Sequence, residues 1–146
     1  MASFKIKMPE DFLLKISNLG ENTDLIMNKV LEAGAKVVQD EVDKSLKSVI
    51  GKNTKNESHS TGQLQRSLGT SRVLQDRNGN FNIKVGFAEN RNDGATNSMI
   101  ANIIEYGKSN QKAKPFLKPA LRKAKEPCIE AMVKTLDEEI SKLWVY

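Results

Sequence analysis

The chain has 146 residues, of which 38% are hydrophobic and 28% are charged, and its formal net charge is +5. This size and composition are typical of one globular domain, so we expect a single domain over residues 1–146. No stretch approaches the roughly 20 apolar residues of a membrane-spanning helix, so we expect a soluble protein made in the cytoplasm without membrane contact. The single cysteine, Cys128, excludes an internal disulfide.

Two helices are predicted in the first third of the chain. Residues 1–20 carry apolar side chains at helical spacing, which indicates a small amphipathic helix ending at Gly20. A longer helix is predicted over about residues 24–50, with Thr23 or Asp24 as its N-cap and Gly51 after its end. Its apolar positions recur every three or four residues: Met27, Val30, Leu31, Val37, Val38, Val42, Leu46 and Val49. Asp40 with Lys44 and Asp43 with Lys47 indicate its exposed face.

A β-hairpin is predicted in the middle of the chain. Residues 51–62 contain no apolar side chain, so we expect a flexible loop there, and the segment Thr61–Leu68 leads into a sheet. The predicted hairpin pairs Ser71–Gln75 with Phe81–Phe87 around a turn at Asp76–Asn80. Asn-Gly between two alternating runs is a strong hairpin signal.

The last third is predicted to be mainly helical. A second flexible loop, about residues 88–97, precedes a short helix over 99–106 that ends in a turn at Gly107. A helix from Pro115 to about Leu143 should be kinked or broken just before Pro127, because proline costs about 3 kcal/mol inside a helix. The expected fold class is therefore α+β: a long N-terminal helix and a kinked C-terminal helix packed on a small antiparallel sheet that contains the hairpin.

The basic residues are unevenly distributed. Seven lie between Gly107 and Lys125 with no acid among them: Lys108, Lys112, Lys114, Lys118, Arg122, Lys123 and Lys125. One interpretation is a solvated loop and helix start, since charge blocks usually are solvated. The other is a docking surface for an acidic neighbour or for DNA.

The residues that most catalytic and metal sites require are scarce. The only histidine, His59, falls in the polar loop, and one histidine with one cysteine cannot supply a zinc site. Glu105 is the one acid in an apolar setting, and we expect it to pair with a lysine or to cap a backbone turn. We therefore expect no enzyme activity, no catalytic residue, no metal and no cofactor.

Three short elements together resemble one family of phage proteins. Thr61–Leu68 is similar to its "TG-x-L-x-x-S-hydrophobic" element, Ile104–Gly107 to its "hydrophobic-E-F/Y-G" element, and Lys114–Leu121 to its "PFL-x-PAL" element. The family is that of tail components typified by the tenth gene product of a lambdoid coliphage, related in role to the minor tail protein Z of lambda-like phages. The resemblance covers roughly residues 20–143. The residues that carry it, and that it implies are structural, are Thr61, Gly62, Leu64, Glu105, Gly107, Pro115, Phe116 and Pro119.

The resemblance implies a structural protein of the virion that completes the head-proximal end of the tail or neck. It implies a homo-oligomeric ring, for example a hexamer, next to the tail terminator, the tail tube and the head–tail connector. Tyr106, Phe116 and Trp144 are candidate anchors at subunit contacts, although Phe116 fits a core position better. Lys108, Lys112, Lys114 and Lys118 are hypothesised to contact an acidic neighbouring ring or DNA that passes through. The alternative is a basic nucleic-acid-binding domain, and its weakness is that the basic block lacks interleaved aromatic residues.

Overall fold

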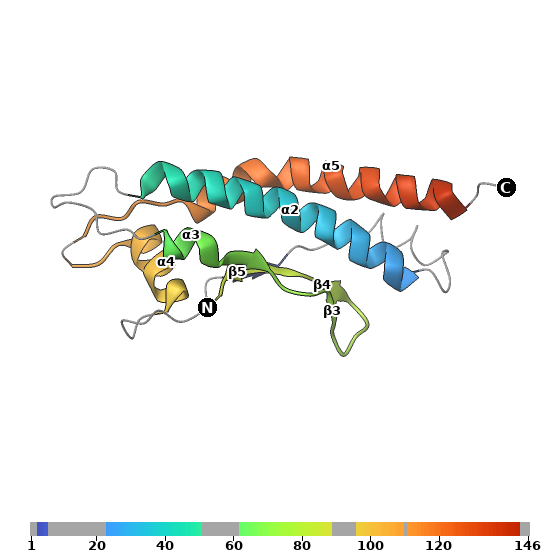
Figure 1. Ribbon diagram of the computed structural model, residues 1–146, viewed down its shortest axis with the longest axis horizontal. Helices are drawn as coiled ribbons and strands as arrows, with labels where there is room; N and C mark the ends of the chain where they lie inside the picture. The colour runs from blue at the N-terminus through green and yellow to red at the C-terminus, as the bar shows by residue number, and fades with distance from the viewer. Residues whose placement is uncertain (1–2, 6–22, 51–61, 89–95, 110, 144–146) are drawn as a thin grey trace.

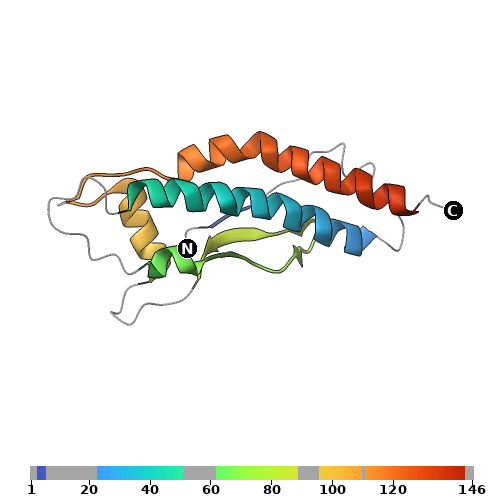
Figure 2. The same ribbon diagram turned by 45° about the horizontal axis from the view of Figure 1, so that its top comes forward.

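The computed structural model describes residues 3–5, 23–50, 62–88, 96–109 and 111–143. Two long helices, α2 (Thr23–Val49) and α5 (Leu117–Leu143), lie side by side along the long axis of the molecule and run in opposite directions (Figure 1). They form one layer of an α+β fold, and short strands and two short helices form the other. Figure 2 shows the same two layers after a turn about the long axis.

The predicted periodicity of α2 is confirmed. Six of its eight predicted apolar positions are buried, and Val37 and Val49 pack partly buried against the core. Lys47 pairs with Asp43 at 2.8 Å as expected, whereas Lys44 pairs with Glu41, at 3.9 Å between the charged atoms, in place of the expected Asp40. The predicted helix within residues 1–20 falls mainly outside the described residues, which there consist of the strand β1 (Ser3–Lys5).

α5 is continuous through Pro127, so the predicted break is wrong. Figure 2 shows its axis bending in the N-terminal half, in agreement with a kink. The helix survives because Pro127 is exposed, so the carbonyl that loses its partner is on the solvent side. The buried face of α5 repeats every four residues, at Ala120, Ala124, Cys128, Met132 and Leu136.

α2 and α5 approach each other closely at Gly34. A Cβ at Gly34 would lie 2.8 Å from both Cγ and Sδ of Met132 and 3.1 Å from Sγ of Cys128. Glycine is therefore required here for close approach of the helices and not for backbone conformation. Burial raises the pKa of the Cys128 thiol, which serves as a small apolar group of this contact.

The sheet is smaller and more divided than predicted. Its three-stranded part has the order β1–β5–β2, all antiparallel, with β2 at Leu68–Thr70 and β5 at Lys84–Phe87. The hairpin consists of β3 (Leu74–Gln75) and β4 (Phe81–Asn82). Ile83, Val85 and Phe87 are buried beneath the helices, so alternate residues of this segment face the core.

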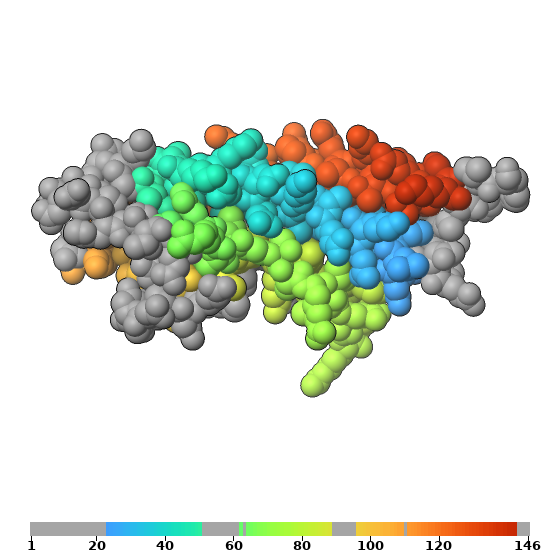
Figure 3. Space-filling model, in the orientation of Figure 1, coloured from blue at the N-terminus to red at the C-terminus, as the bar shows by residue number. Residues whose placement is uncertain are grey.

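The hairpin differs from its prediction at its first strand. Residues 71–73 lie outside any strand, because the hydroxyl of Ser71 accepts the backbone N–H of Lys84 at 2.9 Å and interrupts the ladder. The predicted turn is confirmed: the Asp76 carboxylate accepts the backbone N–H groups of Asn78 and Asn80, and Gly79 has a positive φ of 82°. In Figures 1 and 3 this turn projects from the body of the molecule.

Two short helices cover the end of the sheet near the start of α5. α3 (Gln63–Ser67) was not predicted; it follows Gly62, whose φ is 77°, and buries Leu64. α4 (Asn97–Tyr106) confirms the predicted short helix, and Thr96 caps it by accepting the Met99 N–H at 3.1 Å. Its buried Asn97 donates to the Ala88 carbonyl at 2.9 Å, which fastens α4 to the end of β5. The two predicted flexible loops lie mostly outside the described residues. Among the described helices, none is long and apolar enough to cross a membrane.

Candidate functional site

Glu105 joins α4 to the start of α5. Its side chain is only 3% exposed, and its carboxylate accepts three backbone N–H groups from the first turn of α5. Oε2 accepts from Phe116 at 2.7 Å and from Leu117 at 2.8 Å, and Oε1 accepts from Lys118 at 3.2 Å. A helix begins with unpaired N–H groups and a partial positive charge, so a buried carboxylate is well matched to this position. The expectation that Glu105 caps backbone groups is confirmed.

The chain turns sharply between Glu105 and the helix that it caps. Gly107 closes α4 with φ 78° and ψ 179°, a conformation open essentially to glycine alone. A Cβ there would lie 2.8 Å from the nitrogen of Ala113 and from the oxygen of Gln111. Lys108 and Gln111 exchange two backbone hydrogen bonds, and the N–H of Lys114 donates to the Ile104 carbonyl at 2.7 Å. The segment 107–116, here called the basic arm, is thus tied to α4 at both ends.

Phe116 anchors the far end of the basic arm in the core. It is fully buried, and its ring meets that of Phe87 edge-on at 6.1 Å between centroids. Its carbonyl accepts the hydroxyl of Ser45 at 2.7 Å, which connects the arm to α2. The structure therefore places Phe116 in the core, as the alternative interpretation of the sequence expected, and not at a subunit interface. We call the contacts of Glu105, Gly107 and Phe116 the α4–α5 junction.

The lysines beside this junction point mostly to solvent. Lys108, Lys112 and Lys118 are exposed, as are Arg122, Lys123 and Lys125 on α5, whereas Lys114 is half-buried. Pro115 and Pro119 are exposed on either side of Phe116. The structure thus brings the predicted basic residues to one end of the molecule, where no acid of the same segment neutralises them.

The outer face of α4 carries an exposed apolar stripe. Tyr106 is 67% exposed and Met99 is 52% exposed, and half-buried Ile103 lies between them at helical spacing. They line a shallow hollow of about 480 Å³ with Asn102 and Gly107. Tyr106 was predicted as an interface residue, but Met99 and Ile103 were assigned only to the apolar segment. Met99, Ile103 and Tyr106 are four and three residues apart, so they lie on one face of α4. This spacing is the sequence signal that could have distinguished the exposed face of α4 from its buried face.

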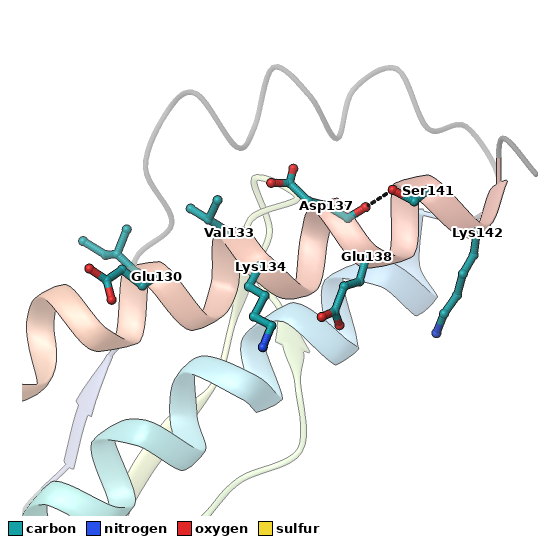
Figure 4. Close-up of a pocket in the computed structure, with 8 residues that line it drawn as sticks. Glu130, Val133, Lys134, Asp137, Glu138, Ser141 and Lys142 are labelled. Carbon is teal, nitrogen blue, oxygen red and sulfur yellow. Dashed lines mark hydrogen bonds between the residues drawn. The ribbon is translucent and has the colours of Figure 1, made fainter.

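A second hollow lies at the opposite end of the molecule, on the outer face of α5. Its volume is about 770 Å³, and it is lined by Ile129, Glu130, Val133, Lys134, Asp137, Glu138, Ser141 and Lys142. Figure 4 shows Glu130, Val133 and Asp137 on one side of the helix and Lys134, Glu138 and Lys142 on the other. Sequence reasoning did not identify this α5 groove. Ile129 and Val133 are half-buried.

The described residues bring no catalytic constellation together. No group of three or more His, Cys, Asp or Glu side chains in the described ranges could hold a metal ion. Both oxygens of Glu105 are occupied by backbone donors, so its role in this geometry is to hold the start of α5. The surface features that stand out in the described part of the chain are the basic arm, the α4 stripe and the α5 groove.

Residues 10–107, about two thirds of the chain, match the family model described as "Bacteriophage HK97-gp10, putative tail-component". The chain belongs to this family. The tail-component match includes Thr61–Leu68 and Ile104–Gly107, so it covers Glu105 and Gly107 of the junction; the third element of the resemblance, Lys114–Leu121, lies beyond it. No curated protein and no solved structure matches the chain. Thr61 and Trp144, two of the predicted site residues of this tail component, and His59 lie outside the described residues.

Proposed function

We propose that this phage tail component completes the head-proximal end of the tail, at the neck, and supports the joining of head and tail as a ring of copies. The observation that carries the proposal is the family match over residues 10–107. The protein would then be part of the virion, made in the bacterial cytoplasm. Its neighbours would be the tail terminator, the tail tube and the head–tail connector.

The geometry supports a role that depends on packing and not on catalysis. A joining protein must present its contact residues at a fixed position relative to a stiff body. Here α2 and α5 provide that body, and the α4–α5 junction holds the basic arm by hydrogen bonds at both of its ends. In a ring, each copy would carry Lys108, Lys112 and Lys118 at equivalent positions, which favours contact with an acidic surface, either of the next copy or of a neighbouring ring.

A triple charge reversal tests the role of the basic arm. Lys108→Glu, Lys112→Glu and Lys118→Glu change only exposed side chains and spare half-buried Lys114. We expect separate heads and tails by electron microscopy and a loss of infectious particles. The matched control reverses three exposed basic residues elsewhere, at Lys36, Arg72 and Lys84. Normal yield of joined virions from the first variant would reject this use of the basic arm.

A nucleic-acid-binding domain stays the second candidate. The observation in its favour is exposed Tyr106 beside Lys108, since an aromatic ring next to basic side chains can stack on a base. The isolated protein would then bind duplex DNA with an affinity that falls steeply as salt is raised. Binding that is absent at low salt would remove this candidate.

A further inference from the structure

The basic arm with the start of α5 and the remainder of α5 carry opposite charge. The basic arm and the first nine residues of α5 contain seven basic residues and no acid, whereas residues 126–142 of α5 contain five acids and two lysines. Lys142 and Glu139 pair at 3.0 Å and offset each other, which leaves four acids and one lysine, Lys134. Figure 1 places α4 and the start of α5 at one end of the long axis and the C-terminal half of α5 toward the other.

Both ends also carry apolar surface. At the basic end, Met99, Ile103 and Tyr106 form the α4 stripe, with Tyr106 and Met99 more than half exposed. At the acidic end, half-buried Ile129 and Val133 line the α5 groove with Glu130 and Glu138, and Val133 also packs against the core. Tyrosine and methionine are enriched at the centres of protein interfaces, with charged residues at the rim.

We propose that the α4 stripe and basic arm of one copy dock in the α5 groove of the next copy. Tyr106 would sit against Val133, and Lys108 and Lys118 would face Glu130 and Glu138. The inference rests on the proposed ring, and it names the surfaces that form it. Charge complementarity between the two ends is what selects a second copy of this chain as the occupant.

The distribution of charge favours a head-to-tail contact. If the α4 stripes of two copies met each other, Lys108 and Lys118 of one copy would approach the same lysines of the other. Like charges brought together in this way oppose binding. A contact between two different surfaces of the same chain repeats from copy to copy, and it closes into a ring when the rotation permits.

Charge reversal on each side provides the test. One variant, Lys108→Glu with Lys118→Glu, makes the basic end acidic, and the other, Glu130→Lys with Glu138→Lys, makes the groove basic. All four side chains are exposed. In sedimentation velocity and native mass spectrometry we expect the unaltered protein to form closed species larger than a dimer. Each variant alone should associate at least about tenfold more weakly.

Mixing the two variants is the decisive measurement. The Glu130→Lys, Glu138→Lys variant keeps its basic end, which fits the unaltered acidic groove of the Lys108→Glu, Lys118→Glu variant. The end of the lysine variant is now acidic, and it fits the groove of the glutamate variant, which is now basic. The equimolar mixture should therefore recover assembly with the two variants in equal number. Tyr106→Ala should weaken association of the otherwise unaltered chain. The controls, Lys36→Glu with Lys84→Glu and Asp24→Lys with Glu32→Lys, should assemble normally.

Three results would overturn the proposed contact. The first is that the unaltered protein stays monomeric at about 1 mM, near the weak limit of specific binding. The second is that the unaltered protein forms dimers and nothing larger. The third is that the mixture of the two variants does not recover assembly. None of these affects the proposed place in the virion, which is tested separately. Suppose that the assembly test fails but a phage that lacks the protein produces separate heads and tails. The neck role then stands, and only this interface is rejected.

Discussion

Replacing Glu105 by alanine is expected to destabilise the fold by about 3 kcal/mol. The N–H of fully buried Phe116 would lose its acceptor, the Glu105 carboxylate, and a buried donor without a partner costs about 1–3 kcal/mol. The N–H groups of half-buried Leu117 and exposed Lys118 can turn to water. For each of these two groups, a hydrogen bond to water replaces the bond to Glu105, and the net loss of stability is about 0.5–1.5 kcal/mol.

The glutamine variant separates charge from shape. Glu105→Gln keeps one acceptor oxygen, which can still serve Phe116 and Leu117, but its amide nitrogen cannot accept the bond from Lys118. It also removes the negative charge at the positive end of α5, an interaction worth up to about 2 kcal/mol when partly buried. The expected loss is therefore about 1–2 kcal/mol, between the unaltered protein and the alanine variant.

Urea unfolding followed by circular dichroism measures both variants. The dependence of the unfolding free energy on urea should stay the same, because the surface exposed on unfolding hardly changes. Glu126→Ala, an exposed acid on the same helix, is the matched control and should stay within about 0.5 kcal/mol. Hydrogen exchange should also accelerate at the amides of Phe116, Leu117 and Lys118. If Glu105→Ala costs less than about 1 kcal/mol, or if these amides stay protected, the junction does not work as argued.

Three further substitutions test the close contacts and the charge network. Gly107→Ala should cost about 2–4 kcal/mol in urea unfolding, because it adds a Cβ at φ 78° and 2.8 Å from the backbone of residues 111 and 113; a loss below about 1 kcal/mol would show that the turn can relax. Gly34→Ala should cost about 1–3 kcal/mol by pushing Met132 away, and the shorter side chain of Met132→Val should recover part of that loss when the two are combined. If the losses of stability of the two single variants simply add in the double variant, the predicted clash between residue 34 and Met132 is contradicted. For Glu139, hydrogen bonds from Lys142 and then Lys29 hold the pKa below its ordinary value of 4.5, so its stabilisation is present above that pH and is lost as the pH falls through the lowered pKa. The stability difference between the unaltered protein and Glu139→Gln should therefore shrink as the pH is lowered below about 4.5, and a constant difference would show that the ion pairs do not matter.

The long helices could be predicted because their information is local. The apolar positions of α2 recur with the period of a helix, and its bounds agree with the prediction to within a residue or two. The strands carry less local information. β1 consists of three residues whose pairing with β5 bridges about eighty positions, so its partner, and not its own pattern, specifies it. The hairpin was found from its turn, but the interruption at Ser71 depends on one side-chain hydrogen bond.

The site was predictable in its residues but not in its geometry. Glu105 was recognised as an acid in an apolar setting, yet the helix that it caps begins twelve residues later. Helix caps are normally sought within a residue or two of the helix start, so no capping pattern points to Glu105. The α5 groove was missed for a related reason. Ile129 and Val133 fit the helical period about as well as the buried residues do, and both are half-buried, so the period alone does not separate the groove from the covered face.

The residues that carry the family resemblance and the residues that would bind partners are therefore different sets. Glu105, Gly107 and Phe116 meet at one point of the fold and determine how the basic arm leaves α4. Lys108 and Lys112 lie on the arm itself and Lys118 lies in the first turn of α5, and the exposed side chains of these lysines contribute nothing to the junction. Changes at the junction should consequently lower the stability of the isolated protein, and changes at the lysines should lower assembly while stability stays the same. If a charge reversal on the arm lowered stability as much as Glu105→Ala does, the division between a structural junction and a separate contact surface would be wrong.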